Sequence, residues 1–147
     1  MTRADSASQN MTAEKMNCAQ SVLTAYCQEL GLDLTLALRV AVGFGGGMGR
    51  TGKTCGAVTG AYMVLGLKQN LTLENTTQIK NQAYQLVKDF NRKFIEKNGS
   101  ITCKDLLGCD LSTPEGQAYA KERGLTKTIC TSLVRDSVEI LESMNKG

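Results

Sequence analysis

The sequence predicts an all-α fold, a compact single-domain bundle of about five or six helices with a glycine-rich loop before the third helix. Two observations carry this prediction. The chain has 147 residues and is 41% hydrophobic, which suits one core of ordinary size. Apolar residues recur three and four positions apart through most of it, which is the helical period. We expect residues 1–12 to form a flexible N-terminus and residues 13–147 to form the domain.

The first expected helix runs from Ala13 to Leu30, where apolar residues form one stripe and Gly31 follows as the end signal. The next segment, from Leu34 to Val42, is a short apolar run. Its length suits either a helix or a buried strand, so both interpretations stay open.

A glycine-rich segment follows, in which Lys53 to Leu67 is expected to be the third helix. Each glycine inside a helix costs roughly 1 kcal/mol relative to alanine, so a packing or functional reason should compensate. The spacing of four between Gly52, Gly56 and Gly60 would let a second helix backbone approach closely.

The most regular pattern predicts a long helix that reaches Asn98. Asn75 and Gln78 resemble a capping pair at its start, and Gly99 is its end signal. The apolar stripe between them keeps the helical period throughout.

A further helix is expected after a start signal in which Ser112 or Thr113 is the cap and Pro114 and Glu115 occupy the first turn. The last expected helix runs from Lys127 to Met144 and carries an apolar inner face.

Composition excludes several functions. The net charge of +3 is spread without a run of one sign, tryptophan is absent and aromatics are 5%, so nucleic-acid binding is not supported. Histidine is absent, which excludes Cys/His zinc fingers, histidine-ligated haem and Ser-His-Asp or Cys-His catalysis within this chain. No segment resembles a signal peptide or a membrane span, so we expect a cytoplasmic protein with reduced cysteines.

Gly47 to Thr54 reads GMGRTGKT and matches the phosphate-loop pattern, in which backbone N–H groups, a lysine and a threonine bind a nucleotide and magnesium. Such a loop belongs to a parallel-sheet fold. Val40 to Phe44 could serve as its first strand, but the chain after Leu67 has helical period. Nucleotide binding is therefore the least favoured interpretation.

The six cysteines are the clearest chemical signal. On one helix Cys18 and Cys27 would lie about 180° apart, so they cannot share a mononuclear metal site. No C-x-x-C pair is present, and we interpret Cys27 and Cys109 as packing residues. Cys55 begins a glycine-rich helix, where the helix dipole and Lys53 would stabilise a thiolate.

Four stretches each carry one cysteine in a distinctive context: NCAQSV with Cys18, FGGGMGRTGKTCGAVTGA with Cys55, ITCKDLLGCDLSTPEG with Cys103 and ICTSLVRDSVEILE with Cys130. Together they resemble the small redox-active proteins of the C_GCAxxG_C_C family nearly end to end. The resemblance implies that the glycine loop presents its cysteine, so the nucleotide motif is completed incidentally.

The leading hypothesis is a cytoplasmic redox protein that transfers electrons to an unidentified redox partner. Its four family cysteines would either ligate an iron–sulfur cluster or cycle between thiol and disulfide. These residues are Cys18, Cys55, Cys103 and Cys130. Unhindered N–H groups near sulfur and close packing would come from the glycines Gly45, Gly46, Gly47, Gly56 and Gly60. The sequence identifies no turnover chemistry, which favours an electron carrier over an enzyme.

The alternative is a non-catalytic helical interaction module whose cysteines are buried and inert. Such a module would form a homodimer through the surface of Gly52, Gly56 and Gly60.

Overall fold

The computed structural model of the chain describes residues 1–144 and confirms the all-α fold class. The last three residues of the predicted domain lie outside the described part. In chain order the elements are α1 (Arg3–Thr12), α2 (Cys18–Thr24), α3 (Cys27–Leu30), α4 (Leu34–Ala41), the 3-10 turn η1 (Val42–Phe44), α5 (Gly45–Met48), α6 (Gly56–Leu67), α7 (Thr76–Asn98), α8 (Cys103–Leu107), α9 (Pro114–Glu122), the π-helical turn η2 (Thr126–Cys130) and α10 (Thr131–Met144).

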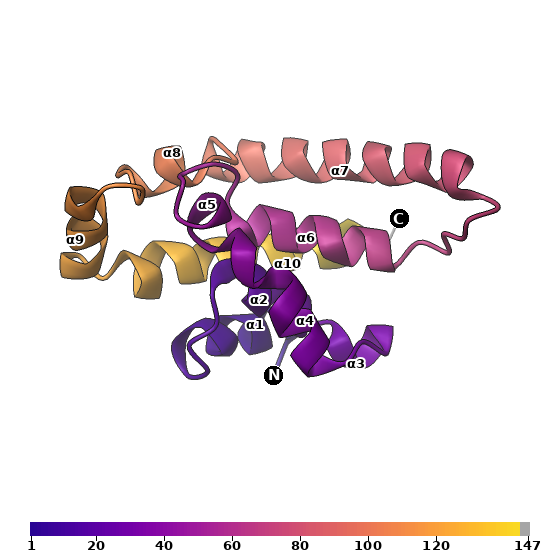
Figure 1. The fold of residues 1–147 in the computed structure, drawn as a ribbon, viewed down its shortest axis with the longest axis horizontal. Coiled ribbons are helices and arrows are strands. Elements are labelled where there is room, and N and C mark those ends of the chain that lie inside the picture. The colour runs from indigo at the N-terminus through magenta and orange to yellow at the C-terminus, as the bar shows by residue number, and fades with distance from the viewer. Residues whose placement is uncertain (145–147) are drawn as a thin grey trace.

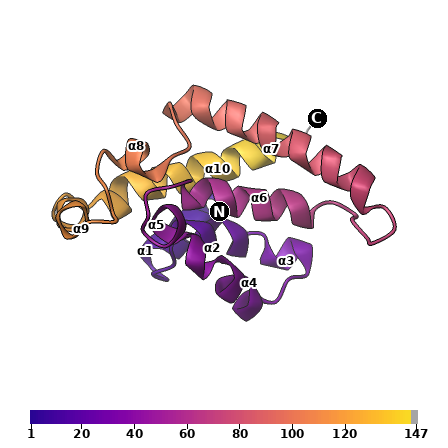
Figure 2. The ribbon, with the colours of Figure 1, turned by 45° about the horizontal axis from the view of Figure 1, so that its top comes forward.

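The helices form three layers (Figure 1). α7 covers one side of a central layer made by α6 and α10, and α1 to α4 cover the other side. The core lies between these layers and includes the fully buried Phe90 and Phe94 of α7. Ser137 of α10 donates a hydrogen bond of 2.7 Å to the carbonyl oxygen of Ala57 in α6. Figure 2 shows α5, α8 and α9 gathered at one end of this stack.

The N-terminal segment differs from the expected flexible arm, because residues 3–12 form α1. Thr2 and Asp5 form a capping box at its start. Ala4, Ala7 and Met11 are buried at helical spacing, and α1 packs on α10. Two of these three side chains are alanines, so the apolar stripe is too weak to recognise in the sequence.

The first predicted helix, Ala13 to Leu30, begins later than expected and consists of two helices, α2 and α3. Lys15 has φ +58°, a left-handed value, so the chain turns before α2 begins. Asn17 and Gln20 form a capping box there, with two hydrogen bonds of 2.9 Å. The helix is interrupted again before α3, which ends at Gly31 as predicted. The helices are therefore shorter and more numerous than expected.

The ambiguous apolar run after Gly31 is helical. Asp33 caps α4 by accepting a hydrogen bond of 2.9 Å from the backbone N–H of Leu36. The start of α9 is as predicted, because Thr113 is its cap and accepts from the N–H of Gly116. The final helix differs in its first turn, which is the π-helical η2.

The long helix α7 ends at Gly99 as predicted. The capping pair expected at its start is not formed, because the side-chain oxygen of Asn75 accepts from the N–H of Thr72 at 2.7 Å. Among residues 1–144 no helix is long and apolar enough to cross a membrane.

The close approach predicted from the glycine spacing is made within the chain, between α2 and α6. A Cβ atom on Gly60 would lie 2.9 Å from the carbonyl oxygen of Ala19. A Cβ atom on Gly56 would lie 3.0 Å from the backbone nitrogen of Ala19. Gly52 lies outside α6 and has φ +71°. At Gly56 and Gly60, the glycine surface suggested for a homodimer is therefore covered by α2.

Two glycines of α6 should respond to alanine in opposite directions. Gly60→Ala should lower the free energy of unfolding by about 1 to 3 kcal/mol, because the added methyl group meets the backbone of α2. Gly66 has nothing within 4 Å of its Cβ position, so Gly66→Ala should raise it by about 0.5 to 1 kcal/mol. Urea unfolding measures both values. Equal effects of one sign would contradict this packing.

Candidate functional site

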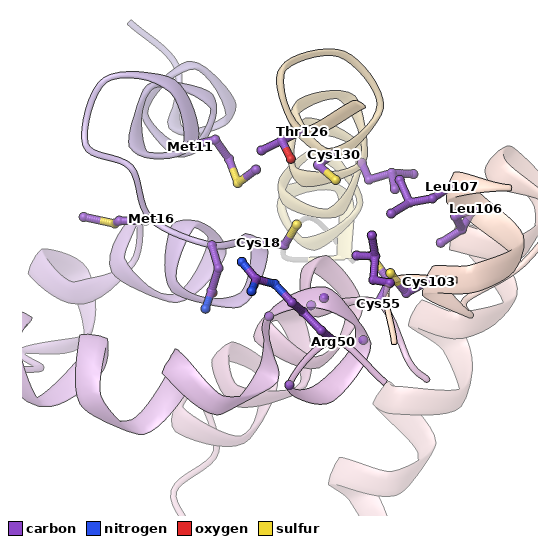
Figure 3. Close-up of a pocket in the computed structure, with 18 of the residues that line it drawn as sticks. Met11, Met16, Cys18, Arg50, Cys55, Cys103, Leu106, Leu107, Thr126 and Cys130 are labelled. Carbon is purple, nitrogen blue, oxygen red and sulfur yellow. The ribbon is translucent and has the colours of Figure 1, made fainter. Parts of the chain in front are cut away.

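The four cysteines of the predicted site line one cavity of about 460 Å³ (Figure 3). We call it the cysteine cavity. It lies at the end of the molecule where α5 and α8 approach the beginning of α10. The apolar side chains that line it include those of Met11, Leu106, Leu107, Leu111 and Leu133. The structure thus brings together residues that are up to 112 positions apart, from 18 to 130.

Each of these cysteines lies where a helix begins. Cys18 and Cys103 are the first residues of α2 and α8, and Cys55 is the N-cap of α6. Cys130 is the last residue of η2 and directly precedes α10. The helix starts therefore converge on the cysteine cavity from different directions.

Backbone pairing holds two of the cysteines side by side. The segments that lead into α6 and α8 meet in an isolated antiparallel bridge. The N–H of Cys55 donates to the carbonyl oxygen of Ile101 at 2.8 Å, and the N–H of Cys103 donates to that of Lys53 at 2.7 Å. Figure 3 shows Cys55 and Cys103 next to each other on the same side of the cavity.

The glycine loop forms a left-handed turn against this pair. Every residue from Gly46 to Arg50 has a positive φ, and the N–H of Gly49 donates to the carbonyl oxygen of Gly45 at 2.8 Å. The left-handed helix costs non-glycine residues roughly 1 to 2 kcal/mol each, which explains the glycines. A Cβ atom on Gly47 would lie 2.6 Å from Cβ of Cys103. The turn therefore forms a close-fitting wall.

Most glycines of the predicted site lie at the cavity. Gly45, Gly46, Gly47 and Gly56 line it. Gly60 does not, because it packs against α2.

The loop is not arranged as a phosphate loop. Two N–H groups of the motif are already used, since those of Gly52 and Lys53 donate to the carbonyl oxygens of Gly46 and Gly47 at 3.3 and 2.9 Å. Helix α6 begins only at Gly56, after the lysine and threonine of the motif. In the described part of the chain no parallel strand enters the loop. These observations oppose nucleotide binding there.

The thiols of Cys18 and Cys130 are joined by a hydrogen bond. This bond and burial raise the pKa of the Cys18 thiol. The same hydrogen bond lowers the pKa of Cys130, which is less buried than Cys18. Cys130 is therefore the thiol of the pair that ionises first, with Cys18 as its donor.

Burial is the main cause of the pKa shifts of the other two thiols, Cys55 and Cys103. It raises the pKa of Cys55 to about 11, although the backbone N–H groups of Ala57 and Val58 oppose this. It raises the pKa of Cys103 to about 12. The thiolate expected at Cys55 is therefore not favoured in the metal-free protein, because desolvation outweighs the start of the helix.

The two remaining cysteines do not line the cavity. Cys27 is buried in α3, with its sulfur 3.9 Å from the carbonyl oxygen of Leu23. Cys109 is half-buried in a small apolar cluster beside Cys103 and Cys130. These positions agree with their interpretation as packing residues.

Several residues of the cavity wall were not predicted from the sequence. Met11 belongs to α1, in the segment expected to be flexible, and Thr126 belongs to the unexpected π-helical turn. Arg50 also lines the cavity. Its signal in the sequence is that it is a charged residue within a run of glycines.

No three cysteine or carboxylate side chains of residues 1–144 are grouped closely enough to hold a single metal ion. The cysteines surround the cavity instead of meeting at a point. A group that contacted all four would have to be larger than one ion.

Comparison with known proteins gave two matches. Residues 16–144 match the model of a family described as "Putative redox-active protein (C_GCAxxG_C_C)". A protein of Archaeoglobus fulgidus named "Uncharacterized protein" is 32% identical over 100 residues, which cover 63% of this chain and 66% of that relative. The chain thus spans slightly less than two thirds of the relative. No solved structure matches.

Proposed function

The chain belongs to the C_GCAxxG_C_C family, described as redox-active, and from this premise we propose that it transfers electrons at a centre formed by the four cysteines of the cavity. The observation that carries the proposal is their convergence on one cavity from four separate elements. Free cysteines stay reduced in the cytoplasm, which is where we expect the protein to act.

An iron–sulfur cluster is the first candidate for the centre. Clusters are commonly held by four cysteine thiolates, which matches the number of cysteines here. The cavity has room for a multi-atom group, and the glycines that line it add no side-chain bulk to its wall. The buried thiols are neutral without metal and would release their protons on binding. When bound, a cluster would supply one-electron transfer.

The chain's own residues would shield such a centre from water. Leu107 and Cys103 of α8 are buried, and Leu133 of α10 is buried on the other side. Burial and low solvent exposure are among the factors that set cluster potentials.

A dithiol/disulfide couple is the second candidate, favoured by the hydrogen bond between Cys18 and Cys130. The ionised Cys130 would attack a small disulfide oxidant and form a mixed disulfide, releasing one thiol of the oxidant. Cys18 would then displace the second thiol and close the protein disulfide. Two electrons and two protons pass from the protein to the oxidant.

The deciding experiment is an absorbance spectrum with iron, sulfide and zinc analysis on protein purified without oxygen. A cluster should give visible charge-transfer bands with stoichiometric iron and sulfide. Cys55→Ser should abolish these signals. Cys27→Ser changes a cysteine outside the cavity and should preserve them.

A colourless, metal-free protein would leave the thiol couple as the centre. Two thiols should then disappear on mild oxidation, and iodoacetamide should modify Cys130 before Cys55. If iron is absent and no thiol is oxidised, the proposal is wrong and the inert interaction module replaces it.

A further inference from the structure

Arg50 holds a backbone conformation that disfavours side chains. Its φ is +62°, within the left-handed turn that begins at Gly46. Of the four preceding positions of the turn, three are glycines and the fourth is Met48. Strained backbone of this kind is concentrated at functional sites. The strain at Arg50 therefore indicates that its side chain has a use.

The side chain of Arg50 lies at the cysteine cavity. It lines the cavity with the four cysteines, and Figure 3 shows its guanidinium end directed toward Cys18. A Cβ atom on Gly46 would lie 2.8 Å from Cγ of Arg50. The glycine therefore leaves the space that the arginine stem occupies.

The positive charge of Arg50 is not neutralised by the surrounding chain. It forms no ion pair with a carboxylate of residues 1–144. The sequence has no Asp or Glu from Leu34 to Leu73. On the facing segment, Asp110 is paired with Lys104 and accepts hydrogen bonds from Ser112.

We propose that Arg50 is the counter-charge of the cysteine centre and raises its reduction potential. This inference rests on the proposed function and concerns the cluster, its first candidate centre. Reduction of a cluster adds one electron without a proton. The reduced form is therefore the more negative, and a nearby cation stabilises it.

The test compares the midpoint potentials of wild-type protein, Arg50→Gln and Arg50→Lys at low salt. The cluster would be titrated with redox dyes. Arg50→Gln should shift the equilibrium toward the oxidised form about three- to tenfold, or about 30 to 60 mV for one electron. Arg50→Lys should keep most of the wild-type potential, and added salt should shrink the difference.

Arg39→Gln is the matched control, because Arg39 is an exposed arginine of α4 outside the cavity wall. An unchanged potential in Arg50→Gln, or an equal shift in Arg39→Gln, would overturn the inference about Arg50. Neither result would affect the proposed function, because the wild-type centre would still be redox-active. A wild-type protein with no redox transition would instead overturn the proposed function itself.

A second variant separates this role from a structural one. Arg50→Gly should raise the melting temperature of the metal-free protein, because glycine adopts a positive φ without strain. It should also lower the potential as Arg50→Gln does. A lower melting temperature would show that Arg50 supports the fold, which would contradict the inference.

Discussion

Replacing Gly47 with alanine should lower the free energy of unfolding by more than about 3 kcal/mol, a large effect for a single methyl group. The added Cβ atom would lie 2.6 Å from Cβ of Cys103 and 2.7 Å from the backbone nitrogen of Lys53. Neither neighbour can move freely, because the N–H of Cys103 donates to the carbonyl oxygen of Lys53. Urea unfolding followed by circular dichroism measures the loss.

Gly49→Ala is the matched control, since Gly49 lies in the same turn with nearly the same φ, +68° against +70°. Its Cβ position has one neighbour within 4 Å, the carbonyl oxygen of Gly43 at 3.8 Å. Gly49→Ala should therefore cost only the backbone strain, about 1 to 2 kcal/mol. Similar losses in the two variants would mean that the turn does not lie against α8 as described.

The contact between Gly47 and Cys103 should affect the proposed cluster as well as the stability of the fold. A shift of the turn away from Cys103 would widen the cysteine cavity, since Gly47 and Cys103 both line it. If the cavity holds a cluster, Gly47→Ala should reduce the iron content per folded molecule as well as the stability. Gly49 also lines the cavity, but its Cβ position has one neighbour within 4 Å, so Gly49→Ala should lower the iron content less than Gly47→Ala does.

Helical period predicted the elements in which one apolar stripe is long enough to be unambiguous. The clearest cases are α7, whose apolar stripe ends at Gly99, and the start of α9, where the cap Thr113 precedes Pro114. The same reasoning failed for α1, whose buried face is made largely of alanine. It also missed the break at Lys15, where a non-glycine residue takes a left-handed conformation that local sequence does not specify.

The candidate site could not be predicted from the spacing of residues along the sequence alone. The glycine content indicated a backbone with unusual freedom, but not the left-handed sense of the turn, which depends on its contact with Cys103. The cysteine set followed from the resemblance of four separate motifs to a family. No distance along the chain predicts their convergence, since packing of α2, α6, α8 and η2 creates it.

The stability of the reduced, metal-free protein should fall as the pH rises from 9 to 11. Cys55 has an ordinary pKa of 9.0 when unfolded and about 11 in the fold, because burial disfavours the thiolate. Between these values the unfolded chain has released its proton and the folded chain has kept it. The free energy of unfolding therefore decreases with pH, and Cys55 alone accounts for about 2 to 3 kcal/mol above pH 11.

Variants assign this loss to the buried thiol. Cys55→Ala should make the fall in stability between pH 9 and 11 shallower, because alanine does not titrate. Cys103, whose pKa burial also raises, still acts in the same direction. Burial also raises the pKa of Tyr26, which loses its proton above pH 10 when unfolded and acts in the same direction. Tyr26→Phe should consequently preserve the fall between pH 9 and 10. An unchanged slope in Cys55→Ala would mean that this thiol is accessible to water. That result would contradict its place inside the cysteine cavity and weaken the cluster proposal, in which Cys55 is a ligand.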